Sequence, residues 1–231
     1  MYRMPEMKGL FIGIVFCFAA FISEAQRTYD TISYVPDYYA KRVALFKKEP
    51  IVGNKIIFLG NSITQFGNWK KLLKDSSVVN RGIAGDITFG VLKRLDDVIV
   101  RKPSKLFIKI GINDISKNIP DKVIVENILL IVKKVKMNSP ATRIFVQSIL
   151  PTNNAAKAEY PDAVGKNDHV VAINDQLMKL AKKNSYTYID LYVLFKDKDG
   201  NLDPRYAVDG LHLNDLAYQR WIELLKDKKY L

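Results

Sequence analysis

Five apolar, β-branched segments alternate with amphipathic segments along this chain of 231 residues. The apolar segments are nearly continuous hydrophobic runs, which is typical of strands that are covered on both faces of a sheet. They predict strands over residues Lys55–Leu59, Val78–Arg81, Lys105–Ile110, Arg143–Leu150 and Tyr186–Tyr192. Strands that alternate with helices form βαβ units. The sequence therefore predicts an α/β fold with a five-stranded parallel sheet and helices on both faces.

Apolar residues recur at helical spacing in four of the amphipathic segments. The four stripes are Tyr39-Val43-Phe46, Ile124-Ile128-Ile131-Val135, Val170-Ile173-Leu177-Leu180 and Ala217-Trp221-Leu224. Pro36 marks the start of the first helix, Pro140 follows the end of the second, Asp168 is expected to cap the third, and the last begins near Asn214. Because no linker or change in composition divides these segments, we expect one domain.

The first 25 residues have the pattern of a secretory signal peptide. Two basic side chains precede an uncharged apolar run at Gly9–Ile22, and Ser23 and Ala25 are small residues at positions −3 and −1 of a cleavage site. The run is shorter than the roughly 20 residues that span a bilayer, so an uncleaved anchor is the weaker alternative. We expect cleavage after Ala25, a single domain over residues 26–231, no stable membrane insertion afterwards, and a secreted or periplasmic location.

The only cysteine of the chain, Cys17, lies inside that apolar run. Phe16 precedes it, whereas a lipoprotein signal requires a small residue there, so lipid attachment is the less favoured interpretation. The mature chain would then contain no cysteine, and no disulfide could stabilise it. Its stability must come from a hydrophobic core, for which about 200 residues suffice.

The formal net charge of +12 limits the classes of partner. The acidic and basic residues of the predicted signal balance, so the mature protein keeps the full charge. A strongly basic exported protein is attracted to anionic surfaces such as acidic glycans or lipid headgroups. Lysines spread over helix faces for solubility explain the charge equally well. Nucleic acid is not an expected partner, because the signal directs the chain away from it.

Polar loop residues follow three of the predicted strands. Ser62 follows the first strand, Gly82 the second and Asn113 the third. In an open parallel sheet the carboxyl ends of the strands share one edge, and ligands bind there. The three loops are therefore predicted to converge on one site.

Ser62, together with Asp209 and His212, predicts a hydrolase that transfers acyl groups. A serine hydroxyl needs a base to take its proton, and the base needs a partner that fixes its tautomer. His212 follows Asp209 by three residues and is one of only two histidines. The other, His169, lies in the first turn of a predicted helix, where a solvated role is expected. Neither histidine has other ligands at metal spacing, so no metal or cofactor is expected.

Three groups could donate hydrogen bonds to a developing oxyanion. Ser62 at a helix start has a free backbone N–H, Gly82 lets its N–H approach a substrate because it has no Cβ, and Asn113 offers a side-chain amide. Each also has a structural interpretation, since serine and asparagine cap helices, and Gly82 and Gly85 are compatible with simple turns.

In combination these segments resemble one family. Ser62, Gly82, Asn113 and His212, in this order, match the four blocks of the SGNH (GDSL-type) esterases. The segment Asn80–Asp86 is especially similar to the acetylhydrolases related to the catalytic subunit of platelet-activating-factor acetylhydrolase. The resemblance spans roughly residues 55–225. The Gly-x-Ser-x-Gly motif of the α/β-hydrolases is absent.

The resemblance implies a three-layer α/β/α, flavodoxin-like fold and ester hydrolysis through an acyl-serine intermediate. It implies these roles: Ser62 as nucleophile, His212 as base, Asp209 as its orienting partner, and the Ser62 N–H, the Gly82 N–H and the Asn113 side chain as oxyanion hole. Asn61 stands where the family name implies aspartate. In the implied mechanism this position transfers no proton. The change from aspartate to Asn61 therefore affects only the local hydrogen bonds.

We therefore expect an exported, metal-independent carboxylic-ester hydrolase of small acyl groups, acetyl above all, acting on a small-molecule or glycan ester. The acetyl group follows from the resemblance and from the lack of an obvious lid or extra domain. The irregular segment Pro151–Asp168 is expected to form one wall of the pocket. The alternatives are a lysophospholipase or thioesterase with an apolar channel, and an inactive glycan-binding protein on the same fold. The sequence sets no oligomeric state.

Overall fold

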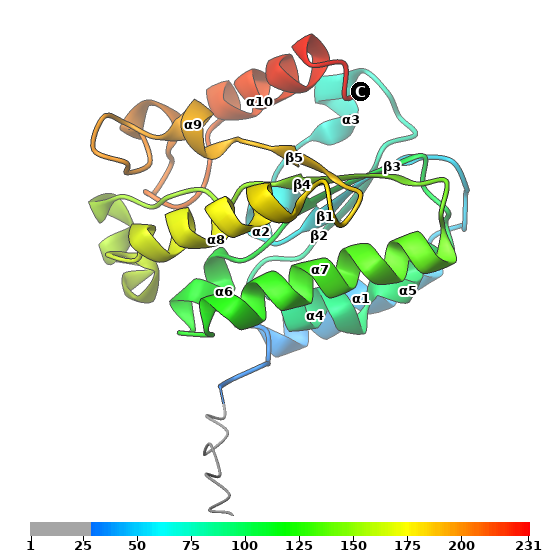
Figure 1. Cartoon of the computed structure of the whole chain (residues 1–231), viewed down its shortest axis with the longest axis horizontal. Helices are drawn as coiled ribbons and strands as arrows, with labels where there is room; N and C mark the ends of the chain where they lie inside the picture. The colour runs from blue at the N-terminus through cyan, green and yellow to red at the C-terminus, as the bar shows by residue number, and fades with distance from the viewer. Residues whose placement is uncertain (1–28) are drawn as a thin grey trace, which may run out of the picture.

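The computed structural model describes residues 29–231, so the predicted signal peptide lies outside the described residues. Five strands form one sheet in the order β2-β1-β3-β4-β5, and every neighbouring pair is parallel (Figure 1). The strands are β1 Ile56–Gly60, β2 Val79–Gly82, β3 Lys105–Lys109, β4 Arg143–Gln147 and β5 Thr187–Ile189. The predicted α/β fold with a five-stranded parallel sheet is confirmed.

Helices connect the strands and cover both faces of the sheet (Figure 1). The α-helices are α1 Pro36–Lys48, α2 Ser62–Gln65, α3 Trp69–Leu73, α4 Thr88–Lys93, α5 Leu95–Ile99, α6 Ile112–Ser116, α7 Asp121–Asn138, α8 Asn167–Leu180, α9 Tyr192–Phe195 and α10 Asp215–Asp227. Three short 3-10 helices are η1 Asn154–Lys157, η2 Pro161–Ala163 and η3 Pro204–Tyr206. Among the helices of residues 29–231, none combines the length and the apolar character that a membrane crossing needs.

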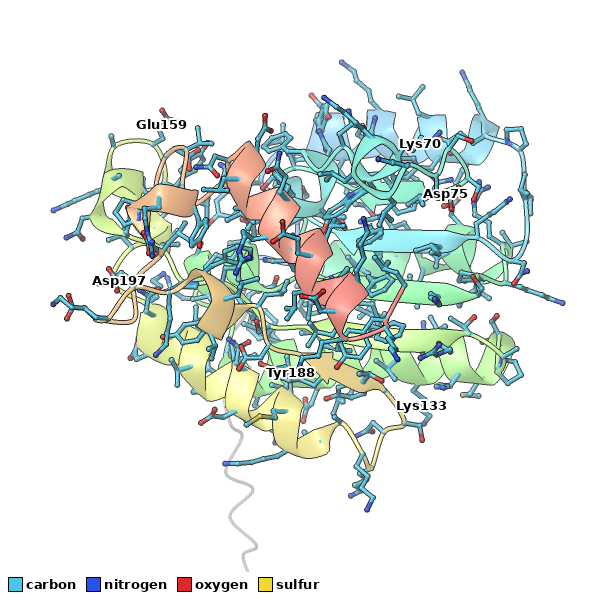
Figure 2. All side chains as sticks on the ribbon, turned by 90° about the horizontal axis from the view of Figure 1, so that it is seen from above. Lys70, Asp75, Lys133, Glu159, Tyr188 and Asp197 are labelled. Carbon is cyan, nitrogen blue, oxygen red and sulfur yellow. The ribbon has the colours of Figure 1, made fainter. Side chains whose placement is uncertain are left out.

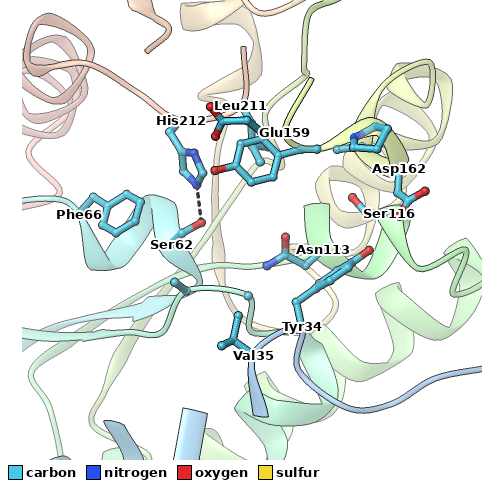
Figure 3. Close-up of a pocket in the computed structure, with 15 residues that line it drawn as sticks. Tyr34, Val35, Ser62, Phe66, Asn113, Ser116, Glu159, Asp162, Leu211 and His212 are labelled. Carbon is cyan, nitrogen blue, oxygen red and sulfur yellow. Dashed lines mark hydrogen bonds between the residues drawn. The ribbon is translucent and has the colours of Figure 1, made fainter. Parts of the chain in front are cut away.

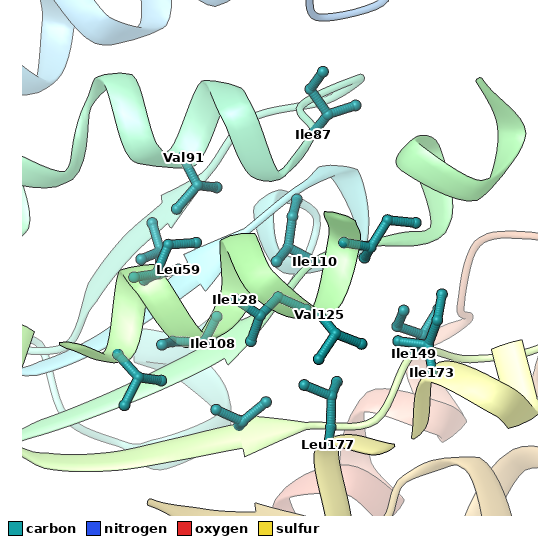
Figure 4. Packing of buried hydrophobic residues seen from close by; sticks show 14 of the residues in the cluster. Leu59, Ile87, Val91, Ile108, Ile110, Val125, Ile128, Ile149, Ile173 and Leu177 are labelled. Carbon is teal, nitrogen blue, oxygen red and sulfur yellow. The ribbon is translucent and has the colours of Figure 1, made fainter. Parts of the chain in front are cut away.

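Two hydrophobic layers form because successive side chains of a strand point to opposite faces. On one face, Leu106 and Ile108 of β3 pack with residues of α4, α5, α7 and α8. Figure 4 shows Ile108 in this cluster with Val91 of α4 and Leu177 of α8. On the other face, Phe107 packs with residues of α3, α9 and α10. Figure 2 shows α10 lying across that second face. The central strands are thus covered on both sides, as their continuous apolar sequences predict.

An aromatic ladder stabilises the α10 face of the sheet. Phe58 of β1 stacks on Phe107 of β3 with ring centroids 4.8 Å apart, and Phe107 stacks on Phe145 of β4 at 4.6 Å. The Trp69 ring of α3 lies parallel over Phe58 at 4.0 Å. Offset aromatic pairs add about 0.5–1.5 kcal/mol each to the burial of their surface. The ladder therefore holds α3 and three strands in one rigid unit.

Several predicted boundaries differ from the structure: β1 and β2 lie one residue further along the chain than predicted, β5 begins one residue later, and β3 ends one residue earlier. Strand β4 ends at Gln147 because the Ile149 N–H donates to the side chain of Asn174 and not to a neighbouring strand. Strand β5 ends at Ile189, and the Tyr192 N–H that begins α9 donates to the Ser148 hydroxyl at 2.7 Å. Asp168 is not the cap of α8, since it lies inside the first helical turn.

Candidate active site

Ser62, His212 and Asp209 form one hydrogen-bonded chain at the carboxyl edge of the sheet, and Figure 3 shows the bond between Ser62 and His212. The Ser62 hydroxyl lies 2.9 Å from His212 Nε2. The opposite ring nitrogen, Nδ1, lies 2.6 Å from a carboxylate oxygen of Asp209. These are the distances that a proton transfer from a serine hydroxyl to an oriented imidazole requires. The structure thus brings together residues that are 150 positions apart in the chain.

The side chain of Asp209 holds the conformation of the loop Asp209–His212. One carboxylate oxygen of Asp209 accepts the backbone N–H groups of Leu211 and His212 at 2.9 and 2.7 Å, and the other oxygen meets the imidazole. Gly210 has a φ of +85°, and a Cβ at this position would collide with the backbone of Ala156. Glycine is therefore required here for both its backbone conformation and the close approach of η1.

The Asp209 carboxylate is stabilised in its ionised form. Burial would raise its pKa, but the N–H bonds from His212 and Leu211 together with the neighbouring imidazole outweigh burial, so the pKa of Asp209 lies below its ordinary value. Two aromatic rings also pack against the imidazole: the ring centroids of Phe66 and Tyr160 lie 5.2 and 5.3 Å from that of His212. An ionised, immobile partner holds the His212 tautomer that accepts a proton at Nε2.

Ser62 occupies the first position of α2. The side chain of Asn61 caps this helix by accepting the N–H of Ile63 at 3.1 Å, which is the role an aspartate would also fill. The amide nitrogen of Asn61 is buried and has no hydrogen-bond partner among the described residues. The Ser62 N–H at the helix start has no intrahelical acceptor, so it is available to a ligand.

Asn113 is the second residue of α6, which begins directly after Gly111; the φ of +134° at Gly111 turns the chain out of β3. One of its two amide hydrogens donates to the backbone oxygen of Asp86 at 2.8 Å. Figure 3 shows the amide nitrogen of Asn113 on the side facing Ser62. The second amide hydrogen can therefore be offered to a group bound at Ser62.

Gly82 is not placed as expected. Its N–H donates to the side-chain oxygen of Asn80 at 2.8 Å, and Gly82 is not among the residues that line the cavity. A Cβ on Gly82 would come closer than 3.0 Å to the backbone of Thr64 and Gln65. Gly82 therefore allows α2 to pack against the end of β2, and its N–H cannot serve a substrate without giving up the bond to Asn80.

Gly85, three residues later in the same loop, lines the cavity. Its φ is +74°, and its carbonyl accepts the Tyr34 N–H and the Ser33 hydroxyl, both at 3.0 Å. Among residues 29–231, no hydrogen bond uses the Gly85 N–H. The two glycines look alike in the sequence, and the only signal that separates them is the Asn80 side chain that occupies the Gly82 N–H.

The ion pair of Arg94 with Asp86 ties the loops of the site to the strands. The pair is buried, with a nitrogen–oxygen distance of 2.8 Å. The guanidinium also donates to the carbonyls of Arg81 on β2 and Gly60 on β1, at 2.9 and 3.0 Å. Asp86 in turn offers its backbone oxygen to Asn113. One buried arginine thus links the ends of two strands with a residue that holds Asn113.

A cavity of about 420 Å³ opens beside Ser62 (Figure 3). This volume lies in the lower part of the range for small-molecule sites. Its lining is Tyr34, Val35, Ser62, Phe66, Ala84, Gly85, Asn113, Ser116, Glu159, Tyr160, Pro161, Asp162, Ala163, Leu211 and His212. Residues 159–163 belong to the segment predicted as a wall. Sequence reasoning missed Tyr34 and Val35, which precede any strand or helix pattern, and Phe66.

His169 lies apart from this cavity. Its ring nitrogen contacts the Asp121 carboxylate at 3.0 Å, and its side chain is half exposed. It is not among the lining residues, although it too has an aspartate partner. Within residues 29–231, no group of three or more histidine, cysteine, aspartate or glutamate side chains is arranged to hold a metal ion.

Comparison with known proteins gives a consistent family assignment. Residues 58–220 match the model of the GDSL-like lipase/acylhydrolase family. The alpha2 subunit of platelet-activating factor acetylhydrolase IB from Rattus norvegicus is 28% identical over 181 residues, which cover 75% of this chain and 73% of the relative.

Solved structures share the fold. A candidate platelet activating factor protein from Streptococcus pneumonia is 28% identical with a TM-score of 0.72, and the match covers 83% of this chain and 91% of that protein. A GDSL-like lipase from Bacteroides thetaiotaomicron is 22% identical with a TM-score of 0.70, covering 84% of this chain and 98% of the lipase.

Proposed function

Because the chain belongs to the GDSL-like lipase/acylhydrolase family and is a carboxylic ester hydrolase, we propose that it is an exported esterase that removes small acyl groups, acetyl above all. One observation carries the proposed mechanism: Ser62, His212 and Asp209 are joined by hydrogen bonds of 2.9 and 2.6 Å beside a cavity of about 420 Å³.

In the first half of the proposed reaction, Ser62 Oγ attacks the ester carbonyl carbon while His212 Nε2 takes the serine proton. The carbon–oxygen bond to the alcohol then breaks, and His212 returns the proton to the departing alcohol, which leaves an acyl-serine. In the second half, water attacks the acyl-serine with His212 again as base. The acid is released and the proton returns to Ser62.

The tetrahedral intermediate carries its negative charge on the former carbonyl oxygen. We place three donors around that oxygen: the backbone N–H of Ser62, the backbone N–H of Gly85 and the free amide hydrogen of Asn113. All three residues line the cavity, and Gly85 replaces Gly82 because the Gly82 N–H is already bound to Asn80. Donors that are fixed before the reaction stabilise charge without reorganisation.

Two observations favour acetyl over a long acyl chain. The cavity is small, and its lining includes polar groups of Asn113, Ser116 and Asp162 along with its aromatic rings. The rat relative at 28% identity is named for the removal of acetyl groups. An acetylated carbohydrate of a cell envelope or glycan is the proposed natural ester, since hydroxyl groups of a sugar can bond the polar side chains of Asn113, Ser116 and Asp162 in the lining.

Export is the proposed location, on the basis of the N-terminal signal pattern. Cleavage after Ala25 would leave Gln26 as the first residue of the secreted or periplasmic protein. N-terminal sequencing of protein recovered from the medium or periplasm tests this. Recovery of an intact Met1 in the membrane fraction would contradict it.

The acyl preference is tested with 4-nitrophenyl esters of two to sixteen carbons. We expect kcat/KM to be highest for acetate and to fall with chain length, and Ser62→Ala to abolish turnover of every ester. Rates that rise with chain length would favour a lysophospholipase or thioesterase. A folded wild-type protein that hydrolyses none of the esters would favour an inactive glycan-binding protein.

A further inference from the structure

Two carboxylates line the cavity of a protein whose net charge is +12. Glu159 and Asp162 both belong to the wall segment, and the lining includes no lysine or arginine. The chain has 36 basic residues, so this lining is opposite in sign to the molecule as a whole. The charge that a bound ester meets is therefore not the charge that the composition predicts.

The two carboxylates act on groups inside the cavity. Burial raises the pKa of the Tyr34 hydroxyl, and the negative charge of Asp162 raises it further. Burial likewise raises the pKa of Tyr160, with Asp209 and then Glu159 adding to the rise. In Figure 3, Asp162, Ser116 and Tyr34 lie beyond Asn113 as seen from Ser62. A substrate that extends from Ser62 past Asn113 would thus meet a negative potential.

Two lysines of this region, Lys166 and Lys117, are held by other partners. Lys166 Nζ donates to the backbone oxygens of Ile115 and Ser116 at 3.1 and 3.0 Å and to the side chain of Asn118 at 2.8 Å. Lys117 forms an ion pair with Asp30 and lies 4.4 Å from the centre of the Tyr34 ring. Neither lysine lines the cavity, so they weaken its negative potential without supplying a contact for an anion.

Three aromatic rings of the lining also favour a cation over an anion. Tyr34, Phe66 and Tyr160 line the cavity, and an aromatic face attracts a cation. An anion gains nothing from these rings and is repelled by both carboxylates. The lining therefore favours a positively charged group over a negatively charged group of equal size.

We propose that the cavity selects esters by the charge of their alcohol, accepting cationic and uncharged alcohols and discriminating against anionic ones. The inference rests on the proposed ester hydrolysis at Ser62 and narrows its substrate class. The cavity and the basic outer surface then respond to opposite charges. An acidic glycan can attract the protein as a whole, but its carboxylate-bearing units are poor substrates.

The test uses three acetyl esters that differ in little but charge: those of choline, of its uncharged isostere 3,3-dimethylbutanol and of 2-hydroxyethanesulfonate. Each kcat/KM is divided by the rate constant of the same ester with uncharged hydroxylamine, which removes differences in intrinsic reactivity without adding a charge effect. At 0.01 M salt we expect the cationic ester to exceed the anionic ester by roughly tenfold or more. At 1 M salt, where the Debye length is only about 3 Å, the ratio should shrink towards one.

Variants assign the effect to the two carboxylates. The double variant Glu159→Gln with Asp162→Asn should lower the cation-to-anion ratio several-fold. The control Glu126→Gln removes an exposed carboxylate on α7, outside the cavity lining, and should leave the ratio at the wild-type value. Circular dichroism and melting temperature check that each variant is folded. If the double variant fails to fold, each single variant is measured against the same control.

Three outcomes overturn the inference: an anionic ester hydrolysed as well as the cationic one, a ratio that salt does not change, or a ratio that the Glu126 control lowers as much as the cavity variants. If 4-nitrophenyl acetate is hydrolysed but none of the three esters is, inhibition of that reaction by the three alcohols supplies the same ranking. If 4-nitrophenyl acetate is not hydrolysed either, the proposed function fails, and the charge preference fails with it.

Discussion

At the scale of single residues, proton transfer in the site depends on which side chains are held and which are free. One oxygen of Asp209 accepts two backbone N–H groups and the other lies 2.6 Å from the imidazole, so the pKa of its carboxyl is lowered; in the proposed mechanism this ionised partner orients His212. One amide hydrogen of Asn113 donates to the backbone oxygen of Asp86, and the other can be donated to a ligand. The site therefore separates the groups that hold the geometry from those that meet the substrate.

Replacing His212 by alanine should lower kcat by about 10³-fold or more, because His212 Nε2 is the group in hydrogen-bond contact with Ser62 Oγ. His169→Ala is the matched control and should keep most activity, since His169 lies outside the cavity lining. The pKa of Asp209 is lowered, so its carboxylate should stay ionised at neutral pH and add no step to the pH dependence of kcat/KM there. A larger loss in the His169 variant would reverse the assignment.

Asn113→Ala should lower kcat by about 10²–10³-fold with little change in KM, because its donor acts on charge that exists only in the transition state. Steady-state kinetics with 4-nitrophenyl acetate measure the two constants separately. Asn138→Ala, at the exposed end of α7, is the control. An unchanged kcat with a raised KM would instead make Asn113 a residue that binds the ground-state substrate.

The two glycines of the β2 loop should respond differently to alanine. Gly82→Ala should destabilise the fold by about 1–3 kcal/mol or more, because its Cβ would press on the backbone of α2. Gly85→Ala places a Cβ at a φ of +74° and 3.1 Å from Tyr34 Cβ, which should cost less stability and mainly reduce kcat. Denaturant titration and kinetics of both variants decide this. A larger loss of kcat per folded molecule in Gly82→Ala than in Gly85→Ala would contradict the assignment of Gly85 to the oxyanion hole.

At the scale of secondary-structure elements, the site depends on how the ends of β1 and β2 are joined. Arg94 donates to a carbonyl at the end of each strand and pairs with buried Asp86. The rigid sheet beneath, with its stacked aromatic rings, fixes where those ends lie. The sheet therefore fixes the positions of α2 and of the loop that follows β2 (residues 83–87), in addition to their own hydrogen bonds.

Arg94→Met should destabilise the protein by about 3–5 kcal/mol, because it leaves the Asp86 carboxylate buried without its partner. The double variant with Asp86→Asn should recover part of that loss, since the uncompensated charge is gone. Urea denaturation of the wild type, both single variants and the double variant closes the cycle. If the double variant is as unstable as the sum of the single changes, the pair is not the reason for the loss.

At the scale of the whole molecule, buried ionisable groups link folding to pH. Burial lowers the pKa of Lys109, at the end of β3, to about 7 from an ordinary value of 10.5. Below pH 7 the charged ammonium is buried in the folded state and destabilises it fully. Between pH 7 and 10.5 the folded protein releases this proton before the unfolded chain does, so stability rises with pH in that window.

Lys109→Met should therefore stabilise the protein most below pH 7 and progressively less as the pH rises towards 10. The expected slope of the difference between variant and wild type is at most about 1.4 kcal/mol per pH unit. Urea denaturation at pH 6 and pH 9.5 measures it, with the exposed Lys133→Met on α7 as control. A stabilisation that is equal at both pH values would show that Lys109 titrates normally.

The sequence by itself determined the order of strands and helices, because each element carries a local pattern. The apolar runs, the three-and-four spacing of Ile124 to Val135, and the capping residue Asn214 all act within a few neighbours. Ser62, Asn113, Asp209 and His212 were predicted as site residues for a related reason: their residue types and order are characteristic of the family. The ends of β4 and β5 could not, since distant side chains such as Asn174 decide where the ladder stops.

Only the tertiary structure decided which glycine has a free N–H and what charge the cavity has. Gly82 and Gly85 are equivalent as residue types, and the Asn80 side chain distinguishes them by occupying one N–H. Net charge is a sum over the sequence, whereas the potential in a cavity depends on distances that folding sets. A chain with a net charge of +12 can therefore have the carboxylates of Glu159 and Asp162 in its cavity lining, because the fold determines which few side chains line the cavity.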